Sequence, residues 1–189
     1  MIISAKTKLS CMGGKVELRG GKVCPGMVRI GFGYVGIFDY DVSRTIWENY
    51  GNIIFWGGTK IGHGCKVSCA ETGVITFGKN FNCTAESQFV CADRITIGND
   101  CLVSWQNLFM DTDFHHIVHR SKEKINHLPI IIGDNVWVGC RCTILKGVNI
   151  PDNSVVAAGS VVKKRFQGAN LLIAGEAAGE RATDICWHL

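Results

Sequence analysis

Aliphatic residues recur at every sixth position in the second half of the chain. They are Ile132, Val138, Ile144, Ile150, Val156 and Val162. Small or β-branched residues lie four places after the first five of them, at Val136, Cys142, Val148, Ser154 and Ser160. A period of six matches neither an α-helix, at 3.6 residues per turn, nor a plain strand, at two. The pattern predicts an all-β prism in which three short strands and their turns close one coil, and successive coils stack as parallel strands.

The same frame appears earlier, at Ile61-Gly62, Phe77-Gly78 and Ile97-Gly98. Between Ile97 and Ile132 it is interrupted by a polar stretch that cannot pack inside a prism. We therefore expect one domain, with irregular early coils over 1–60, regular coils over 61–110 and 131–164, an extruded loop over 111–130 and a cap over 165–189. Extruded loops on rigid scaffolds often carry function.

The end of the chain lacks the repeat. Residues Gly175–Ala182 predict a short helix or turn over the open end of the coil stack, because a solenoid needs caps. The apolar segment Ile185–Trp187 predicts a plug against the same end. An excursion from the coils is expected over Asp39–Tyr50.

Composition excludes several classes of protein. A net charge of +4 from scattered basic residues does not indicate nucleic-acid binding. The chain has no apolar run long enough for a membrane span, and its first residues do not resemble a signal peptide, so we expect a cytoplasmic protein. Its ten cysteines form no C-x-x-C pair. They predict reduced, buried packing residues and no metal site.

Two segments carry a resemblance to a known family. The loop Asp111-Thr112-Asp113-Phe114-His115 and the segment Ile132–Gly139 (IGDNVWVG), together with the repeats, resemble the hexapeptide-repeat acyltransferases. The similarity covers about residues 50–178 and is greatest to sugar acetyltransferases, including galactoside and maltose acetyltransferases and those that modify capsule or lipopolysaccharide. The resemblance implies a left-handed parallel β-helix and a homotrimer with active sites between neighbouring prisms.

The expected reaction is direct acetyl transfer from acetyl-CoA to a sugar hydroxyl in a ternary complex. His115 is the predicted general base, because imidazole is neutral near pH 7 and accepts a proton; the resemblance places the catalytic histidine of the family in this loop. His116 is the alternative if the register of the loop differs by one. Asp113 is the candidate catalytic carboxylate that orients the base, with Asp111 or a backbone carbonyl as alternatives. His119 and His127 are expected to be solvated loop residues.

The donor site is expected around Trp137, whose place in the repeat makes it project outward. The resemblance suggests that Trp137 lines the cofactor and acceptor cleft. Small residues on successive coils would admit the pantetheine arm: Gly139, Cys140, Ala157 and Ala158. The resemblance places Lys163 and Lys164 near the phosphates of coenzyme A. Cys140 is not expected to act as a nucleophile.

The sequence gives little information about which residues bind the acceptor. Candidates that could face the cleft are Glu86, Trp105, Gln106, Asn107 and the excursion over Asp39–Tyr50. The segment Gly175–Arg181 lacks the Asn and Pro that relatives often carry there, so Arg181 is only a possible replacement for a late basic contact of the family.

Three other functions are compatible with the sequence. The same scaffold could acetylate the nitrogen of an amino sugar or the hydroxyl of serine. A γ-class carbonic anhydrase would need three zinc-binding histidines, for which His63, His115 and His119 supply the residue type. A non-catalytic β-helix scaffold is the third alternative, although a polar loop in the middle of the prism does not favour it.

Overall fold

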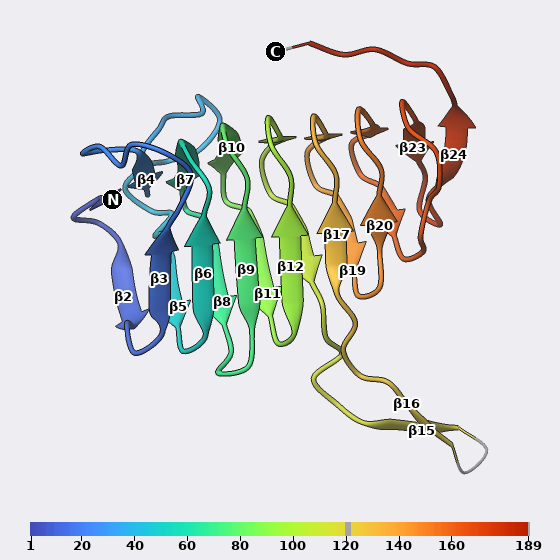
Figure 1. The fold of residues 1–189 in the computed structure, drawn as a ribbon, viewed down its shortest axis with the longest axis horizontal. Helices are drawn as coiled ribbons and strands as arrows, with labels where there is room; N and C mark the ends of the chain where they lie inside the picture. The colour runs from blue at the N-terminus through green and yellow to red at the C-terminus, as the bar shows by residue number, and fades with distance from the viewer. Residues whose placement is uncertain (120–121, 189) are drawn as a thin grey trace.

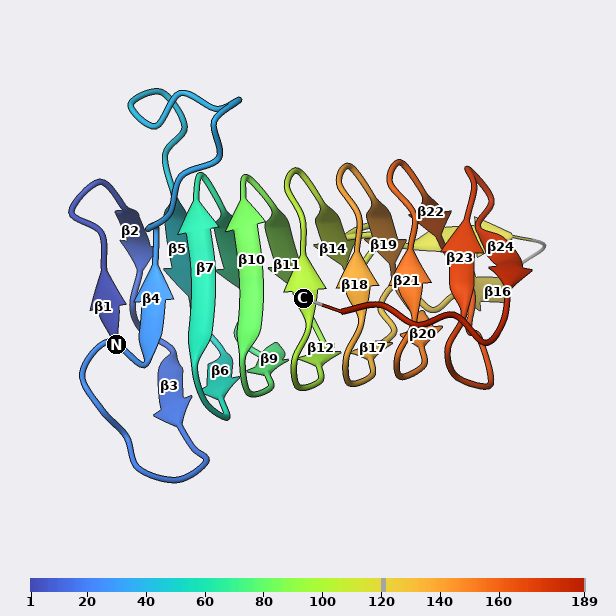
Figure 2. The same cartoon turned by 90° about the horizontal axis from the view of Figure 1, so that it is seen from above.

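The repeat forms a three-sided prism in the computed structural model, which describes residues 1–119 and 122–188 (Figures 1 and 2). Each side is a sheet of parallel strands, apart from the antiparallel last strand of sheet A, and the chain passes from one side to the next. Sheet A contains β1 (Ile2–Ile3), β4 (Val28–Ile30), β7 (Thr59–His63), β10 (Phe81–Ala85), β13 (Leu102–Val103), β18 (Trp137–Val138), β21 (Val155–Val156), β23 (Leu172–Ala174) and β24 (Gly179–Ala182).

Sheet B contains β2 (Lys8–Cys11), β5 (Ile46–Asn49), β8 (Lys66–Cys69), β11 (Gln88–Cys91), β14 (Leu108–Met110), β19 (Thr143–Leu145) and β22 (Val161–Val162). Sheet C contains β3 (Lys15–Leu18), β6 (Asn52–Phe55), β9 (Val74–Phe77), β12 (Arg94–Ile97), β17 (Ile130–Ile132) and β20 (Asn149–Ile150). The predicted all-β coil stack is confirmed, and no helix occurs in the part of the chain that the structure describes. None of the described elements is a helix long and apolar enough to cross a membrane.

Strand pairing shows the coil length directly. Trp137 pairs with Val155, and Thr143 pairs with Val161, so each coil of the later region takes 18 residues. Three six-residue units per coil is the length that the period predicted. Residues before position 60 also contribute strands to all three sheets, beginning with β1, β2 and β3.

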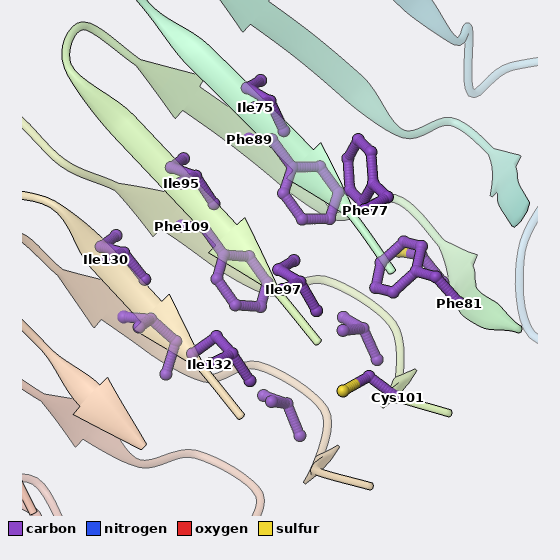
Figure 3. Close-up of a cluster of buried hydrophobic side chains, with 14 of the residues drawn as sticks. Ile75, Phe77, Phe81, Phe89, Ile95, Ile97, Cys101, Phe109, Ile130 and Ile132 are labelled. Carbon is purple, nitrogen blue, oxygen red and sulfur yellow. The ribbon is translucent and has the colours of Figure 1, made fainter. Parts of the chain in front are cut away.

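The core is the axis of the prism. The aliphatic residues at every sixth position are all at most 3% exposed, and Ser154 and Ser160 of the second series are at most 1% exposed. In the middle coils phenylalanine fills the axis: Phe89 stacks on Phe109 with ring centroids 5.0 Å apart and meets Phe77 edge-on at 5.5 Å (Figure 3). Such contacts between aromatic rings add to the burial of apolar surface.

Six of the ten cysteines are buried, as predicted, whereas Cys24 and Cys186 are exposed and Cys11 and Cys140 are half-buried. Cys65, Cys83, Cys101 and Cys142 are each at most 1% exposed. Figure 3 shows Cys101 among the buried side chains of the core. Burial raises the pKa of the Cys101 thiol to about 12. These thiols therefore act as small apolar packing groups.

The extruded loop is confirmed. It leaves after β14 and returns at β17, and within it β15 (Ile117–His119) and β16 (Lys122–Lys124) pair antiparallel. Figure 1 shows this hairpin extending away from the prism. The predicted loop residues Arg120 and Ser121 lie outside the described residues.

The C-terminal segment agrees with the prediction only in part. Of the predicted short helix or turn over Gly175–Ala182, the turn is observed at residues 175–178, after which β24 runs back and pairs antiparallel with β23. The plug predicted for Ile185–Trp187 is wrong. The last residues run back along the side of the prism across several coils (Figure 2), where Trp187 Nε1 donates to the carbonyl of Asn135 at 2.8 Å. A backbone acceptor on the side of the prism holds this indole, so it does not cover the end.

Candidate functional site

Asp111 anchors the base of the loop. Its carboxylate is fully buried and accepts hydrogen bonds from the backbone N–H groups of Ala92, at 2.7 Å, and Asp93, at 2.9 Å. Buried carboxylates need such donors, because an unpaired buried charge is costly. Both oxygens face the preceding coil, so Asp111 fixes the loop and is not placed to orient His115.

Residues 112–115 form the tight turn that carries the predicted base. Phe114 has a φ of 60°, and its N–H donates to Thr112 Oγ1 at 2.9 Å. The N–H of His115 donates to the carbonyl of Asp113 at 2.7 Å. The turn leaves His115 exposed on the surface of the prism.

Lys146 holds this turn from the following coil. It comes directly after β19, and its ammonium group bonds the carboxylate of Asp113 and the carbonyl of Ile125, the latter at 2.6 Å. Because Ile125 lies on the returning arm, one cation ties both arms of the loop to the prism. The carboxylate of Asp113 therefore faces Lys146. Sequence reasoning missed Lys146, since a lysine after a strand belongs to no motif and only coil stacking brings it to Asp113.

The other histidines of the loop are His116, His119 and His127. His116 is exposed. His127, on the returning arm, is also exposed, and its Nδ1 lies 2.7 Å from Oδ1 of Asn126. The side chain of His119 lies outside the described residues.

His63 lies within an early coil. It is 1% exposed, and its ring centroid lies 5.3 Å from that of Tyr40 and 6.1 Å from that of Phe38. Across residues 1–119 and 122–188, no three or more His, Cys, Asp or Glu side chains gather in a group that could hold a metal ion.

Trp137 begins β18 and projects from the outer face of sheet A, with 37% of the residue exposed. Its Nε1 donates to Ser104 Oγ at 3.1 Å, which fixes the indole against the preceding coil. The ring of Trp187 lies 6.0 Å away. Trp137 thus presents a held aromatic surface.

The small residues lie where sheet A turns toward sheet B. Cys140 and Ala157 are half-buried and Ala158 is exposed. A Cβ on Gly139 would lie 2.7 Å from the backbone nitrogen of Ala158, which real side chains do not tolerate. Coil stacking alone therefore requires glycine at position 139.

Lys163 and Lys164 follow β22, at the end of a sheet B strand, and both are exposed. The ammonium group of Lys164 lies 5.2 Å from the ring centroid of Phe166. These cations lie on the coils after Trp137, toward the C-terminal end of the prism.

Glu86, Gln106 and Arg141 form a polar ladder along the edge between sheets A and B. Gln106 Nε2 donates to Glu86 Oε2 at 3.0 Å, and Arg141 Nε donates to Gln106 Oε1 at 3.0 Å. All three residues have φ between 52° and 59°, as the corner requires. The ladder is next in sequence to Trp105 and Cys140, so it adjoins the small residues. Sequence analysis considered Glu86 and Gln106 and missed Arg141.

Two acceptor candidates are corrected by the fold. Asn107 is 1% exposed, and it bonds the carbonyl of Ser104 and the N–H of Cys142 at 2.9 and 2.7 Å. It therefore joins coils and does not face a cleft. The excursion expected over 39–50 ends earlier, because β5 is a regular strand whose Trp47 is 2% exposed in the core.

His115 and Trp137 lie on different sides of the prism. The loop leaves between sheets B and C, whereas Trp137 belongs to sheet A. In Figure 2, β18 faces the viewer and the β15–β16 hairpin lies behind the prism. One chain alone does not bring these two side chains together.

Known proteins share the repeat and the fold. Residues 129–164 match the hexapeptide repeat of succinyl-transferase. The crystal structure of the polySia specific acetyltransferase NeuO has a TM-score of 0.54 at 21% identity and covers 98% of this chain and 90% of its own. The maltose O-acetyltransferase from Clostridium difficile 630 has a TM-score of 0.51 at 21% identity, covering 94% and 69%. Residues 129–164 thus carry the hexapeptide repeat, and the chain has the fold of a left-handed parallel β-helix.

Sequence relatives of this chain carry acetyltransferase names. Galactoside O-acetyltransferase of Escherichia coli (strain K12) is 36% identical over 103 residues, which are 53% of this chain and 50% of the relative. The putative lipopolysaccharide biosynthesis O-acetyl transferase WbbJ of the same strain is 28% identical over 138 residues, covering 68% and 70%. The chain spans about half the length of the first curated relatives it matches.

Proposed function

We propose that this protein transfers an acetyl group from acetyl-CoA to a sugar hydroxyl. The observation that carries the proposal is His115, exposed on a turn that Asp111 and Lys146 anchor to the prism. An exposed imidazole on a fixed turn suits proton transfer, which depends on position. The names of the relatives, galactoside O-acetyltransferase among them, support a sugar acceptor.

In the proposed reaction neutral His115 accepts the proton of the acceptor hydroxyl. The hydroxyl oxygen forms a bond to the carbonyl carbon of the thioester, the carbon–sulfur bond breaks, and the proton passes to the departing thiolate. The products are the acetyl ester and free coenzyme A. No covalent enzyme intermediate is needed, and half-buried Cys140 therefore has no part as a nucleophile.

Asp113 acts as a positioning residue in this proposal. Its backbone carbonyl accepts from the N–H of His115, and its carboxylate is held by Lys146. Both contacts fix the backbone from which the His115 side chain projects. Orientation of the base by a fixed neighbour is a common requirement of histidine catalysis.

The proposed site is shared between chains in a homotrimer. His115 and Trp137 lie on different sides of one prism, so a second copy must bring its His115 turn to Trp137. A closed symmetric ring repeats that contact at every interface. The exposed positions of both side chains are compatible with such a contact.

The donor is proposed to lie along the edge that follows Trp137. Its pantetheine arm would lie against Gly139, Cys140, Ala157 and Ala158, whose side chains are absent or small. Lys163 and Lys164 would attract its phosphates, because ammonium groups bind phosphate by charge-assisted hydrogen bonds.

The natural role is proposed to be acetylation of a surface polysaccharide unit in the cytoplasm, where the chain would meet acetyl-CoA. Two relatives support this role: the lipopolysaccharide enzyme named above, and an uncharacterized 24.8 kDa protein in the cps region of Klebsiella pneumoniae, 33% identical over 141 residues.

The first test measures release of free coenzyme A from acetyl-CoA with a panel of neutral, amino and nucleotide-linked sugars and serine. We expect a sugar to stimulate release, and His115→Ala to reduce it about a hundredfold or more. His116→Ala is the matched control, with little expected loss. Selective loss in His116→Ala would transfer the base to that residue. Amino-sugar or serine dependence would change the acceptor class, and no release with any acceptor would overturn the transferase proposal.

Mixing variants tests the shared site. His115→Ala and Trp137→Ala are each expected to be nearly inactive alone. After joint refolding at equal amounts, roughly a quarter of the sites in a random trimer combine an intact His115 with an intact Trp137 from the neighbour. Recovery of roughly that fraction of activity supports sites formed between chains. No recovery, in trimers shown by light scattering to be mixed, would contradict them.

A further inference from the structure

Arg29 and Lys60 lie directly opposite each other on neighbouring strands of sheet A. The pairing of β4 with β7 places Arg29 beside Lys60, and both side chains are exposed. Their neighbours Ile30 and Ile61 are fully buried, so the two cations occupy the outer face of the sheet. Like charges directly opposite each other on adjacent strands are unfavourable.

None of the carboxylates whose side chains the structure describes forms an ion pair with either cation. The guanidinium of Arg29 lies over the ring of Phe32, with its central carbon 5.4 Å from the ring centroid. That contact orients Arg29 without neutralising it. The pair is therefore an unbalanced positive site that an anion would stabilise.

The two cations also line a depression of the surface. A cavity of about 260 Å³ is bordered by both of them and by Asn80, Phe81 and Asn82, and an adjoining one of about 190 Å³ by both of them and by Phe32 and Gly33. Asn82 pairs with Lys60 on the next strand. Its amide adds a neutral hydrogen-bonding group beside the positive pair.

Lys60 and Trp137 lie at the same register position on different strands of sheet A, and paired residues connect them. Asn82 pairs with Leu102, and Leu102 pairs with Trp137. Three strand spacings separate Lys60 from Trp137, which is about 14 Å. The proposed donor groove extends from Trp137 toward the C-terminal coils. The surface of sheet A between Trp137 and Lys60, on the N-terminal side, therefore remains available to the acceptor. A single hexose ring is shorter than this span.

We infer that Arg29 and Lys60 bind an anionic group of an extended acceptor, a carboxylate or phosphate that lies about 14 Å from the hydroxyl to be acetylated. This inference rests on the proposed function for the direction of the acceptor and names its chemical class. The shared chemistry is an oxyanion on a sugar derivative longer than one ring. An acidic oligosaccharide and a nucleotide-linked sugar are its two possible sources.

Binding measured without acetyl-CoA tests the site independently of turnover. The probes are tetragalacturonate, its uncharged methyl ester and UDP-glucose, titrated by calorimetry into the full chain at low salt. We expect at least one anionic probe to bind and the ester to bind more weakly. The double variant Arg29→Gln/Lys60→Gln should weaken anion binding about tenfold or more. Preference for tetragalacturonate identifies a carboxylate source, and preference for UDP-glucose identifies a phosphate source.

A matched double variant removes the same charges elsewhere. Lys8→Gln/Arg94→Gln alters exposed cations on sheets B and C and should leave binding unchanged. Equal binding of the ester, equal weakening in both double variants, or no binding of either anion would overturn the inference. So would dissociation of the assembly in Arg29→Gln/Lys60→Gln, since the cations would then face carboxylates of a partner chain. Anion binding without acetyl transfer would refute the proposed function and leave the anion site intact.

Discussion

The indole ring of Trp187 lies 6.0 Å from that of Trp137, with an angle of 42° between their planes. Two hydrogen bonds place it there: Ile185 N–H donates to the carbonyl of Asn170 at 3.1 Å, and Trp187 Nε1 donates to that of Asn135 at 2.8 Å. The C-terminal tail thus reaches the aromatic residue of the proposed donor cleft. The two rings form one surface on sheet A.

Replacing Trp187 with Ala should uncover Trp137. We expect greater quenching of tryptophan fluorescence by acrylamide per remaining indole, and a loss of unfolding free energy of about 1 kcal/mol from the aromatic contact. Urea unfolding checks the second effect. Trp187→Phe is the matched control, because it keeps a ring and loses the Nε1 donor. Unchanged quenching and stability in Trp187→Ala would show that the tail does not lie on Trp137 in solution.

Breaking the contact between Asp113 and Lys146 should loosen the His115 turn. Asp113→Asn and Lys146→Met are each expected to reduce acetyl transfer about tenfold, because a small displacement of a catalytic group is enough for such a loss. The double variant should be no worse than Lys146→Met, since that single variant already removes the contact with Asp113 as well as the one with the carbonyl of Ile125. Coenzyme A release measures the effect, with Lys8→Met as a control. Additive losses would mean that the two residues act separately.

The coil stack was predictable because its signal is repeated and local. Each aliphatic residue at a sixth position must be buried. The coil pattern is therefore indicated separately by Ile144, Ile150 and Val156, all of which are buried. The extruded loop was predictable for the opposite reason, since polar residues cannot enter that core. Strand pairing then follows from the coil length alone.

Contacts between coils were not predictable from the sequence. Lys146 meets Asp113 across 33 residues, and Trp187 meets Asn135 across 52. Neither pair belongs to a repeat, so only the stacking of the folded chain reveals it. The prediction for the tail was wrong because an apolar segment can pack either against the end of the prism or along its side. The hydrogen bond to a backbone carbonyl could not be predicted, since every residue has such a carbonyl.

Substitution of Phe89 should lower the free energy of unfolding more than substitution at most other core positions. It is fully buried between Phe109 and Phe77. Phe89→Ala is expected to reduce the unfolding free energy by about 3–5 kcal/mol, because it combines loss of buried apolar surface with a cavity. Phe89→Leu should cost less, and Tyr34→Ala, at a residue 76% exposed, should cost almost nothing. Equal effects of Phe89→Ala and Tyr34→Ala in urea unfolding would contradict this core.

The buried thiols should make stability fall in alkaline solution. Burial raises the pKa of Cys101 from 9.0 to about 12, so the folded chain keeps a proton that the unfolded chain releases. The contribution to stability is complete below about pH 9 and is lost as the pH rises from 9 toward 12. Urea unfolding of the wild type and Cys101→Ala across this range should show a shallower decline in the variant. An identical decline would mean that Cys101 does not titrate with folding. A thiol reagent at pH 8 gives an independent check, since it should modify exposed Cys24 and Cys186 rapidly and Cys101 only after unfolding.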